Sequence, residues 1–213
     1  MNFATAERNR VATIAATNPI EALTLARAIA DPWFRCQALS MAAVHLTDRR
    51  MRLSAIEDAL LAANELVEPN RVVSVSAWPI KALALCEETR RLDAETARLL
   101  TIVATEPSPV RRLDALRLLL GSVIATWTGT AREVAEAFAA ACLAPLASGQ
   151  RNRKGESCLE ECLPALAHLD AAFAERLRVQ LPASRAARAA QAIETMRNVS
   201  LAELVSWPNL GAR

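Results

Sequence analysis

The sequence is poor in the residues that turns and sheets need. Glycine occurs only five times in 213 residues, tyrosine is absent, and aromatic residues make up 4% of the chain. No stretch shows sustained period-two alternation of β-branched residues between turn signals, so we expect no β-sheet. Alanine, leucine, arginine and glutamate, which lose little free energy on entering a helix, are common instead. The composition therefore predicts an all-α protein.

A strong charge of one sign and long apolar runs are also missing. The 25 basic and 23 acidic residues leave a net charge of +2, which disfavours nucleic acid as a partner. The N-terminus carries Glu7, Arg8 and Arg10 and does not resemble a signal peptide. No apolar run reaches the roughly 20 residues of a membrane-spanning helix. We therefore expect a soluble, cytoplasmic protein without a membrane partner.

The cysteines do not form an even set. There are five of them, Cys36, Cys86, Cys142, Cys158 and Cys162. Because the number is odd and the chain is long enough to build a core, we expect reduced thiols rather than a disulfide framework.

Two of these cysteines raise the question of a metal site. Cys158 and Cys162 are four positions apart, so they share a face of a helix, and His168 follows six residues later. Such thiols could bind a metal if folding brought Cys142 or His45 to them. Free cysteine is more often a buried apolar residue, and Pro164 interrupts the face before the histidine. We expect neither a metal nor a cofactor.

What the sequence does contain is a regular spacing of prolines. The separations are 37, 40, 36 and 37 residues, between Pro32, Pro69, Pro109, Pro145 and Pro182. Proline is favoured at the first position of a helix, where its missing N–H is not needed. Each of these prolines is therefore predicted to open the second helix of a two-helix unit.

Residues that cap helices precede the prolines at a similar spacing. They are Asn18, Ser54, Asp93, Thr130 and Asp170. Three of them open a capping-box pattern, at residues 18–21, 54–57 and 130–133, in which the side chains at both ends bond free backbone N–H groups. We predict that these residues cap the first helix of each unit.

Together the two series predict one domain over residues 1–213, an α-α superhelix, or solenoid, of about five helix-turn-helix units with end helices. The units cover approximately residues 18–53, 54–92, 93–129, 130–169 and 170–199, and the end helices cover 3–17 and 200–207. The end helices are expected to cover the two ends of the stack. Residues 150–155 are predicted to form a loop in the irregular fourth unit, and Pro79 and Pro164 to kink or end second helices.

The segments around two of the prolines resemble a known repeat. Residues 31–39 follow the pattern Asp-Pro-x-x-Arg-x-x-Ala-Leu, and residues 107–116 follow Pro-x-Pro-Val-Arg-Arg-x-x-Ala-Leu. Both resemble the turn and second helix of HEAT-type repeats, and the pairing of two helices per unit is similar to tetratricopeptide arrays. The tryptophan, glycine and tyrosine pattern of tetratricopeptide units is missing. The resemblance implies an adaptor whose concave face binds another protein.

Arginines recur just after the prolines, and each needs an anion because a cation near a helix N-terminus faces the positive end of the dipole. These candidate binding residues are Arg35, Arg71, Arg112 and Arg185. The anion is either a carboxylate of the stack or an acidic peptide, phosphate or nucleic-acid backbone lying along it. The candidate carboxylates are Asp31, Glu68, Glu106 and Asp114. Residues that recur at the same position of each repeat usually pack one repeat against the next. This favours ion pairs within the protein over binding of an external anion.

A second basic group, Arg151, Arg153 and Lys154, lies in the predicted loop beside Gly155. It is a candidate for binding an anionic partner, with a solvated charge run as the alternative.

The sequence has no nucleophile elbow, phosphate loop or dinucleotide fingerprint. We therefore predict a protein interaction scaffold whose second helices present a concave surface to a protein or an acidic peptide. The alternative is a small helical enzyme or metal-binding protein with a site near residues 150–168.

Overall fold

Helices account for the regular secondary structure in the part of the chain that the structure describes, which confirms the predicted all-α class. The computed structural model describes residues 3–145 and 149–204. The helices are α1 (Phe3–Ile14), α2 (Pro19–Arg27), α3 (Pro32–Ala43), α4 (Arg49–Asn64), α5 (Pro69–Leu85), α6 (Thr89–Ala104), α7 (Pro109–Val123), α8 (Gly129–Leu143), α9 (Arg153–Leu169), α10 (Ala171–Arg178), α11 (Ala183–Thr195) and α12 (Leu201–Leu204). None of these described helices is long and apolar enough to cross a membrane.

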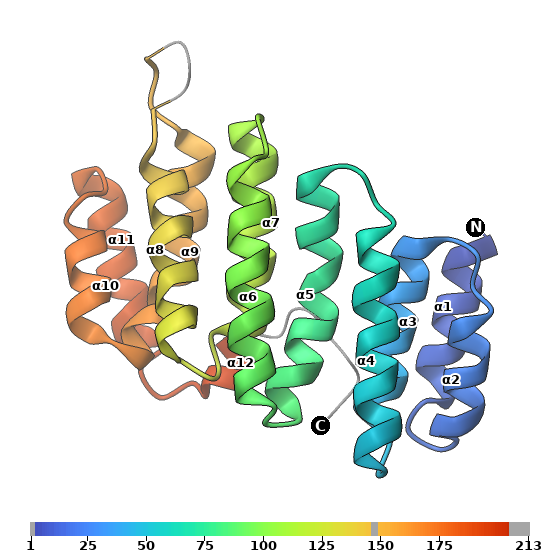
Figure 1. Cartoon of the computed structure of the whole chain (residues 1–213). Coiled ribbons are helices and arrows are strands. Elements are labelled where there is room, and N and C mark those ends of the chain that lie inside the picture. Colours follow the sequence, from blue (N-terminus) through green and yellow to red (C-terminus); the bar gives the residue numbers. More distant parts are fainter. Residues whose placement is uncertain (1–2, 146–148, 205–213) are drawn as a thin grey trace.

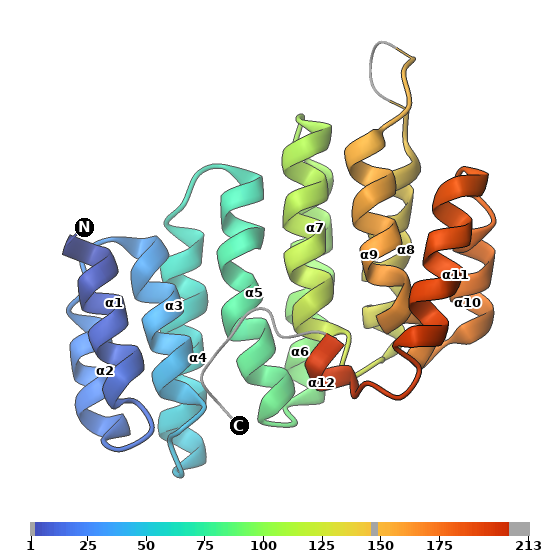
Figure 2. The ribbon, with the colours of Figure 1, turned by 180° about the vertical axis from the view of Figure 1, so that it is seen from behind.

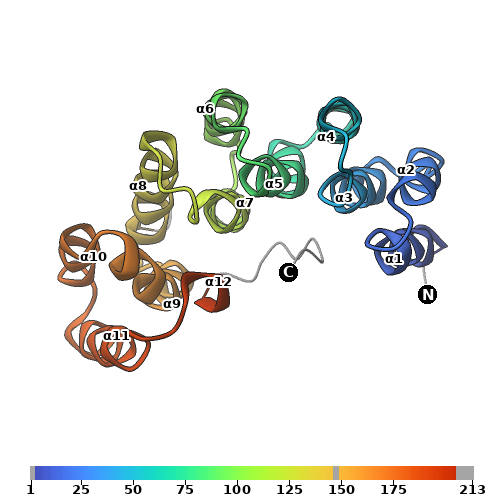
Figure 3. The ribbon, with the colours of Figure 1, turned by 90° about the horizontal axis from the view of Figure 1, so that it is seen from below.

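The helices form two curved layers (Figures 1 and 3). The inner layer of the arc holds α1, α3, α5, α7, α9 and α11, and the outer layer holds α2, α4, α6, α8 and α10. From α3 to α11 the inner helices all run in the same direction, so their N-termini lie along one edge, at the top of Figure 2. We call this the N-terminal edge. Any side chain in the first turn of an inner helix therefore lies near this edge.

Prolines begin the inner helices largely as predicted. Pro32, Pro69 and Pro109 occupy the first position of α3, α5 and α7. Pro182 lies one residue earlier, at the N-cap of α11. The prediction is wrong for Pro145, because α8 ends at Leu143 and α9 begins only at Arg153.

The predicted caps of the outer helices are confirmed at the two ends of the chain. Asn18 accepts a hydrogen bond from the backbone N–H of Glu21 at 3.3 Å. Asp170 accepts one from the N–H of Phe173 at 2.8 Å. In both cases the side-chain oxygen satisfies an N–H group that the helix itself leaves free.

The other three predicted caps are wrong, because each helix begins further upstream; Asp48 and Thr128 cap α4 and α8, whereas Glu88, at the N-cap of α6, makes no side-chain cap bond. Ser54 lies inside α4, whose N-cap Asp48 accepts a bond from the N–H of Met51 at 2.8 Å. Asp93 lies inside α6, and Thr130 lies inside α8, whose N-cap is Thr128. In α4 and α6 the residues between the helix start and the predicted cap are mostly arginine, leucine and methionine, which are good helix formers. In α8 the one residue between them is Gly129, and Thr128 caps the helix before it.

The predicted interruptions in the fourth unit and in α5 are confirmed only in part. Residues 150–152 lie outside the helices, as predicted, but residues 153–155 form the first turn of α9 rather than a loop. The Asn152 side chain caps that turn by accepting from the Gly155 N–H at 2.9 Å. Pro79 and Pro164 lie inside α5 and α9, so neither proline ends its helix, whereas the predicted kinks stay predictions. Both prolines are buried, and the apolar contact of their rings offsets the hydrogen bond that each removes.

The end helices differ in their placement. α1 falls within the predicted range and packs against α2 and α3. α12 begins at the predicted capping box, in which Ser200 and Glu203 bond each other's backbone N–H groups at 3.3 and 3.0 Å. It does not cover the end of the stack, however. It packs against α9 on the inner side of the arc, because Leu201 and Leu204 contact the core there (Figure 3). Residues 205–207 of the predicted helix lie outside the described residues.

The contact between α9 and α8 requires a glycine at position 155. A Cβ atom there would lie 2.2 Å from the carbonyl oxygen of Cys142. We therefore expect Gly155→Ala to lower the free energy of unfolding by about 1–3 kcal/mol through overpacking. At Gly129 a Cβ would meet nothing within 4 Å, so Gly129→Ala is the matched control. Urea denaturation followed by circular dichroism measures both, and equal stabilities for the two variants would contradict the close approach.

Candidate binding groove on the inner face

The first of the repeated arginines, Arg35, is bonded within the protein. Its guanidinium donates to the carbonyl oxygens of Ile29 and Ala30, each at 3.1 Å, and pairs with the carboxylate of Glu65. The two carbonyls belong to the turn that precedes α3, so the arginine ties this turn to its own helix. Asp31, a predicted partner, instead caps α3 by accepting from the N–H of Trp33 at 2.9 Å.

Arg112 and Arg71 find different partners. Arg112 donates at 2.6 Å to the backbone oxygen of Glu106, not to its carboxylate. Arg71 lies 3.9 Å from the carboxylate of Glu68, and its guanidinium carbon lies 5.7 Å from the centroid of the Trp33 ring. Among the predicted carboxylates, Glu68 is thus the one that pairs with an arginine of this series, while backbone oxygens supply much of the negative charge.

Arg185 belongs to a network of alternating charges between α9 and α11. Arg151 pairs with Glu156 at 2.7 Å, and Glu156 pairs with Arg185 at 3.3 Å. Arg185 continues to Glu160 at 2.6 Å, and Glu160 binds Arg188 at 2.7 Å. Hydrogen bonds from Arg188 and Arg185 hold the pKa of Glu160 below its ordinary value, although burial acts in the opposite direction. The network joins the two helices at the N-terminal edge.

Beside this network lies a recess of about 1120 Å³, which we call the basic recess. Val110 of α7 and Pro182 and Ser184 at the start of α11 form part of its wall. Its cationic residues are Arg151, Arg153, Lys154, Arg185 and Arg188. Three carboxylates, those of Asp114, Glu156 and Glu160, pair with four of these cations, which leaves an excess of two positive charges.

Arg153 differs from the other cations of the basic recess. Its side chain is exposed, and it forms no ion pair with any residue that the structure describes. Lys154, its neighbour, is bonded to Asp114 of α7 at 2.7 Å. The predicted basic group is therefore brought together with Arg185 at one place, and within it Arg153 is the cation most available to a partner.

The inner layer is least closely packed between α7 and α9. α3 packs against α5, α5 against α7, and α9 against α11, whereas α7 and α9 have no comparable interface. Long side chains bridge the junction instead. Arg117 of α7 pairs with Glu161 of α9 at 2.8 Å, and Asp114 of α7 holds Lys154 of α9. The result is a groove on the inner face.

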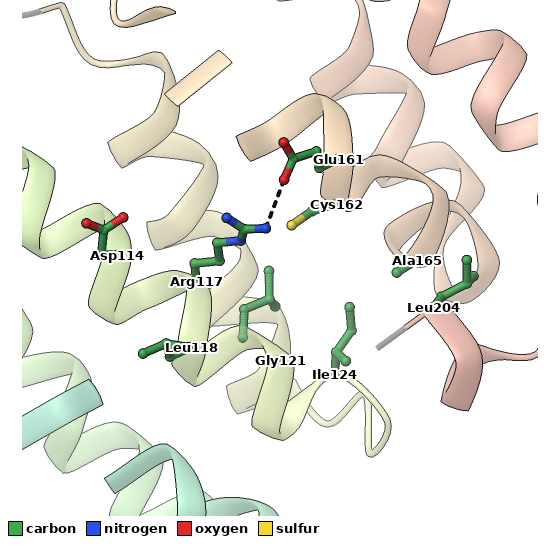
Figure 4. Close-up of a pocket in the computed structure, with 10 residues that line it drawn as sticks. Asp114, Arg117, Leu118, Gly121, Ile124, Glu161, Cys162, Ala165 and Leu204 are labelled. Atoms are coloured by element: carbon green, nitrogen blue, oxygen red, sulfur yellow. Dashed lines mark hydrogen bonds and ion pairs between the residues drawn. The ribbon is translucent and has the colours of Figure 1, made fainter. Parts of the chain in front are cut away.

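The lower part of this groove is a pocket of about 530 Å³, which we call the α7–α9 pocket (Figure 4). Its surface is mostly apolar, and the Arg117–Glu161 pair spans its rim. Leu204 of α12 closes it at one end. The remaining lining residues are Asp114, Leu118, Leu120, Gly121, Ile124, Cys162 and Ala165. Sequence reasoning missed this pocket. Gly121, in the last turn of α7, interrupts the helical pattern, but a single glycine does not identify a pocket.

The cysteines near the pocket are held in the protonated form. Burial raises the pKa of Cys162 to about 12 and raises the pKa values of Cys142 and Cys158. A protonated thiol is neither a good nucleophile nor a metal ligand. His168 is exposed, and the described residues contain no group of three or more histidines, cysteines or acids arranged to hold a metal. The geometry thus gives no support to the metal-binding alternative.

Comparisons with known proteins add no relative. No family model matches the chain, and neither the curated proteins nor the solved structures contain a match. The groove and the recess therefore carry the functional argument by their own chemistry.

The charge of Glu160 is expected to stabilise the fold in a pH-dependent way. Its pKa is lowered in the folded protein, so the stabilisation is present above the ordinary glutamate pKa of about 4.3 and is lost as the pH falls through the lower folded value. Glu160→Gln should therefore be less stable than the original protein at pH 7, and the difference in stability should shrink as the pH falls below about 4.3. Urea unfolding across this range measures the difference.

Glu194→Gln serves as the control for this change, because the Glu194 side chain is 71% exposed and is paired only at 3.4 Å, with Arg197. It should leave stability almost unaltered. A loss of stability in Glu160→Gln that is the same at pH 3.5 and pH 7 would show that shape, not charge, matters at this position.

The raised thiol pKa values predict slow alkylation. At pH 8 we expect iodoacetamide to label Cys158 and Cys162 at least about tenfold more slowly in the native protein than in the unfolded chain, because the thiolate is scarce and shielded. Mass spectrometry of quenched samples gives the rate for each cysteine. Native labelling as fast as that of the unfolded chain would restore the enzyme or metal-binding alternative for residues 150–168.

Proposed function

We propose that this protein is an interaction scaffold, an α-solenoid of helix pairs, that binds a peptide segment of another protein in the α7–α9 pocket. The single observation that carries the proposal is the opening of the inner layer between α7 and α9, which leaves an apolar pocket on the inner face. The occupant is a peptide segment because the pocket adjoins the basic recess along the same two helices, so that an extended chain can occupy both.

The repeat interpretation rests on three features of the chain. Prolines begin successive inner helices at nearly equal spacing, the inner helices run parallel to one another, and first-turn arginines bind the turn that precedes their own helix. A stack of this kind buries its apolar surface between neighbouring units and leaves an extended inner face for a partner. The similarity of residues 31–39 and 107–116 to HEAT-type repeats points the same way.

The dimensions and chemistry of the pocket suit one large apolar side chain as an anchor. A volume of about 530 Å³ lies within the range of sites that bury most of a drug-sized ligand, so the pocket has room for a large apolar side chain. The walls are apolar, and the Arg117–Glu161 pair at the rim can bond the backbone of a bound segment. Anchors of this type, an apolar side chain surrounded by a polar rim, provide most of the binding energy in many protein interfaces.

The proposal is tested by selecting peptides against the purified full-length chain from a phage-displayed library of random dodecamers. Gly121→Leu places a bulky side chain in the pocket, and Gly129→Leu makes the same change where a Cβ meets nothing within 4 Å. We expect fluorescence anisotropy to give at least about tenfold weaker binding of the selected peptides to Gly121→Leu, because the anchor can no longer enter.

Gly129→Leu should bind the selected peptides as the original protein does. Circular dichroism of both variants shows whether the fold is retained. If no peptide is enriched, or if the enriched peptides bind both variants equally well, the pocket is not the binding site and the proposal is wrong.

A further inference from the structure

We infer that the bound segment combines a large apolar residue with acidic residues about four positions away, which reach the basic recess. This inference rests on the proposed function and specifies the chemistry of the partner. It follows from the position of the two cavities along the same groove and from the charges that remain unpaired at its upper end.

The α7–α9 pocket and the basic recess adjoin each other. Asp114 lines the pocket, Lys154 lines the recess, and the two are bonded to one another at 2.7 Å. Val110 of α7 lines the recess, and Leu118 of the same helix lines the pocket. They are eight positions apart, which at 1.5 Å per residue is about 12 Å. An extended peptide advances about 3.3 Å per residue, so about four residues span this distance.

The α7–α9 pocket is electrically neutral, whereas the basic recess is positive, and this difference favours a bound segment that is apolar at one end and acidic at the other. At the pocket, Arg117 and Glu161 neutralise each other, so an apolar side chain enters without leaving a charge unpaired. At the recess there are five cationic side chains and three carboxylates that pair with them, so two positive charges remain. Arg153 is exposed and has no ion pair among the described residues. Carboxylates of a partner complement this excess.

The backbone at the recess adds to the same preference. Pro182, the N-cap of α11, has no side-chain bond to the first turn of that helix, and Ser184 of this turn lines the recess. Free N–H groups at a helix N-terminus favour a negative charge nearby. The guanidinium groups supply the larger part of the attraction, since they are mobile and can form paired hydrogen bonds with a carboxylate.

The sequences of the selected dodecamers provide the first test. Compared with the unselected library, we expect enrichment of Asp or Glu three to five positions from a Leu, Ile, Met or Phe. Changing the acidic residues of a selected peptide to Asn or Gln should weaken its binding by about fivefold to tenfold, and raising the salt concentration should weaken the acidic peptide more than the amide version.

Charge reversal on the protein provides the second test. Arg153→Glu should weaken the binding of the acidic peptide by about fivefold to tenfold, because Arg153 is expected to contact only the acidic residues. The binding of the peptide that carries Asn or Gln instead should not change. Arg50→Glu is the matched control: Arg50 is also exposed and lies in the first turn of a helix, but on α4 in the outer layer. It should affect neither peptide.

The two variants Gly121→Leu and Arg153→Glu distinguish a failure of this inference from a failure of the proposed function. If selected peptides lose binding in Gly121→Leu but carry no acidic enrichment, or bind Arg153→Glu as tightly as the original protein, the inference is wrong and the pocket remains the binding site. If binding never depends on Gly121, both are wrong.

Discussion

The contact between the start of α9 and the end of α8 is the constraint on which the rest of the structure depends. The Asn152 side chain accepts from the Gly155 N–H and donates to the carbonyl of Ala141 at 3.2 Å. Because Gly155 lacks a Cβ, the first turn of α9 lies directly on the backbone at Cys142. α9 is thereby fixed to the outer helix α8 and to α10 and α11, while its inner neighbour α7 packs against α5 and α8.

This arrangement separates the residues that hold the fold from those that are available to a partner. Arg35 and Arg112 are occupied by the turns that precede their helices, and Arg185 is occupied by Glu156 and Glu160. The open junction between α7 and α9 is crossed by side chains rather than by packed backbones. Side-chain pairs exposed to water contribute little to stability, so a bound segment can displace or reshape them without unfolding the layer.

Local rules account for the parts of the fold that the sequence predicted. A proline at the first helical position depends only on the missing N–H and the fixed φ, and so Pro32, Pro69 and Pro109 begin helices as expected. Caps were less predictable because several residues compete for the role. Asp48 caps α4 in place of Ser54, and nothing in the spacing of the caps distinguishes the two.

The binding groove depends on contacts that no local pattern records. The proximity of Gly155 to Cys142, and of Arg117 to Glu161, joins residues from different helices. The sequence singled out the basic group at 151–154 and Arg185 separately, and only the fold brings them into one recess. The α7–α9 pocket could not be predicted because it is defined by a packing contact that is missing between two helices, which the sequence of either helix does not encode.

The central claim is that the junction between α7 and α9 receives a partner's side chain. A crystal structure of the full chain with a selected dodecamer tests this most directly. We expect an apolar side chain of the peptide to lie between Leu118 and Ala165, with the Arg117–Glu161 pair beside it. A peptide bound on the outer layer, with the α7–α9 pocket unchanged, would contradict it.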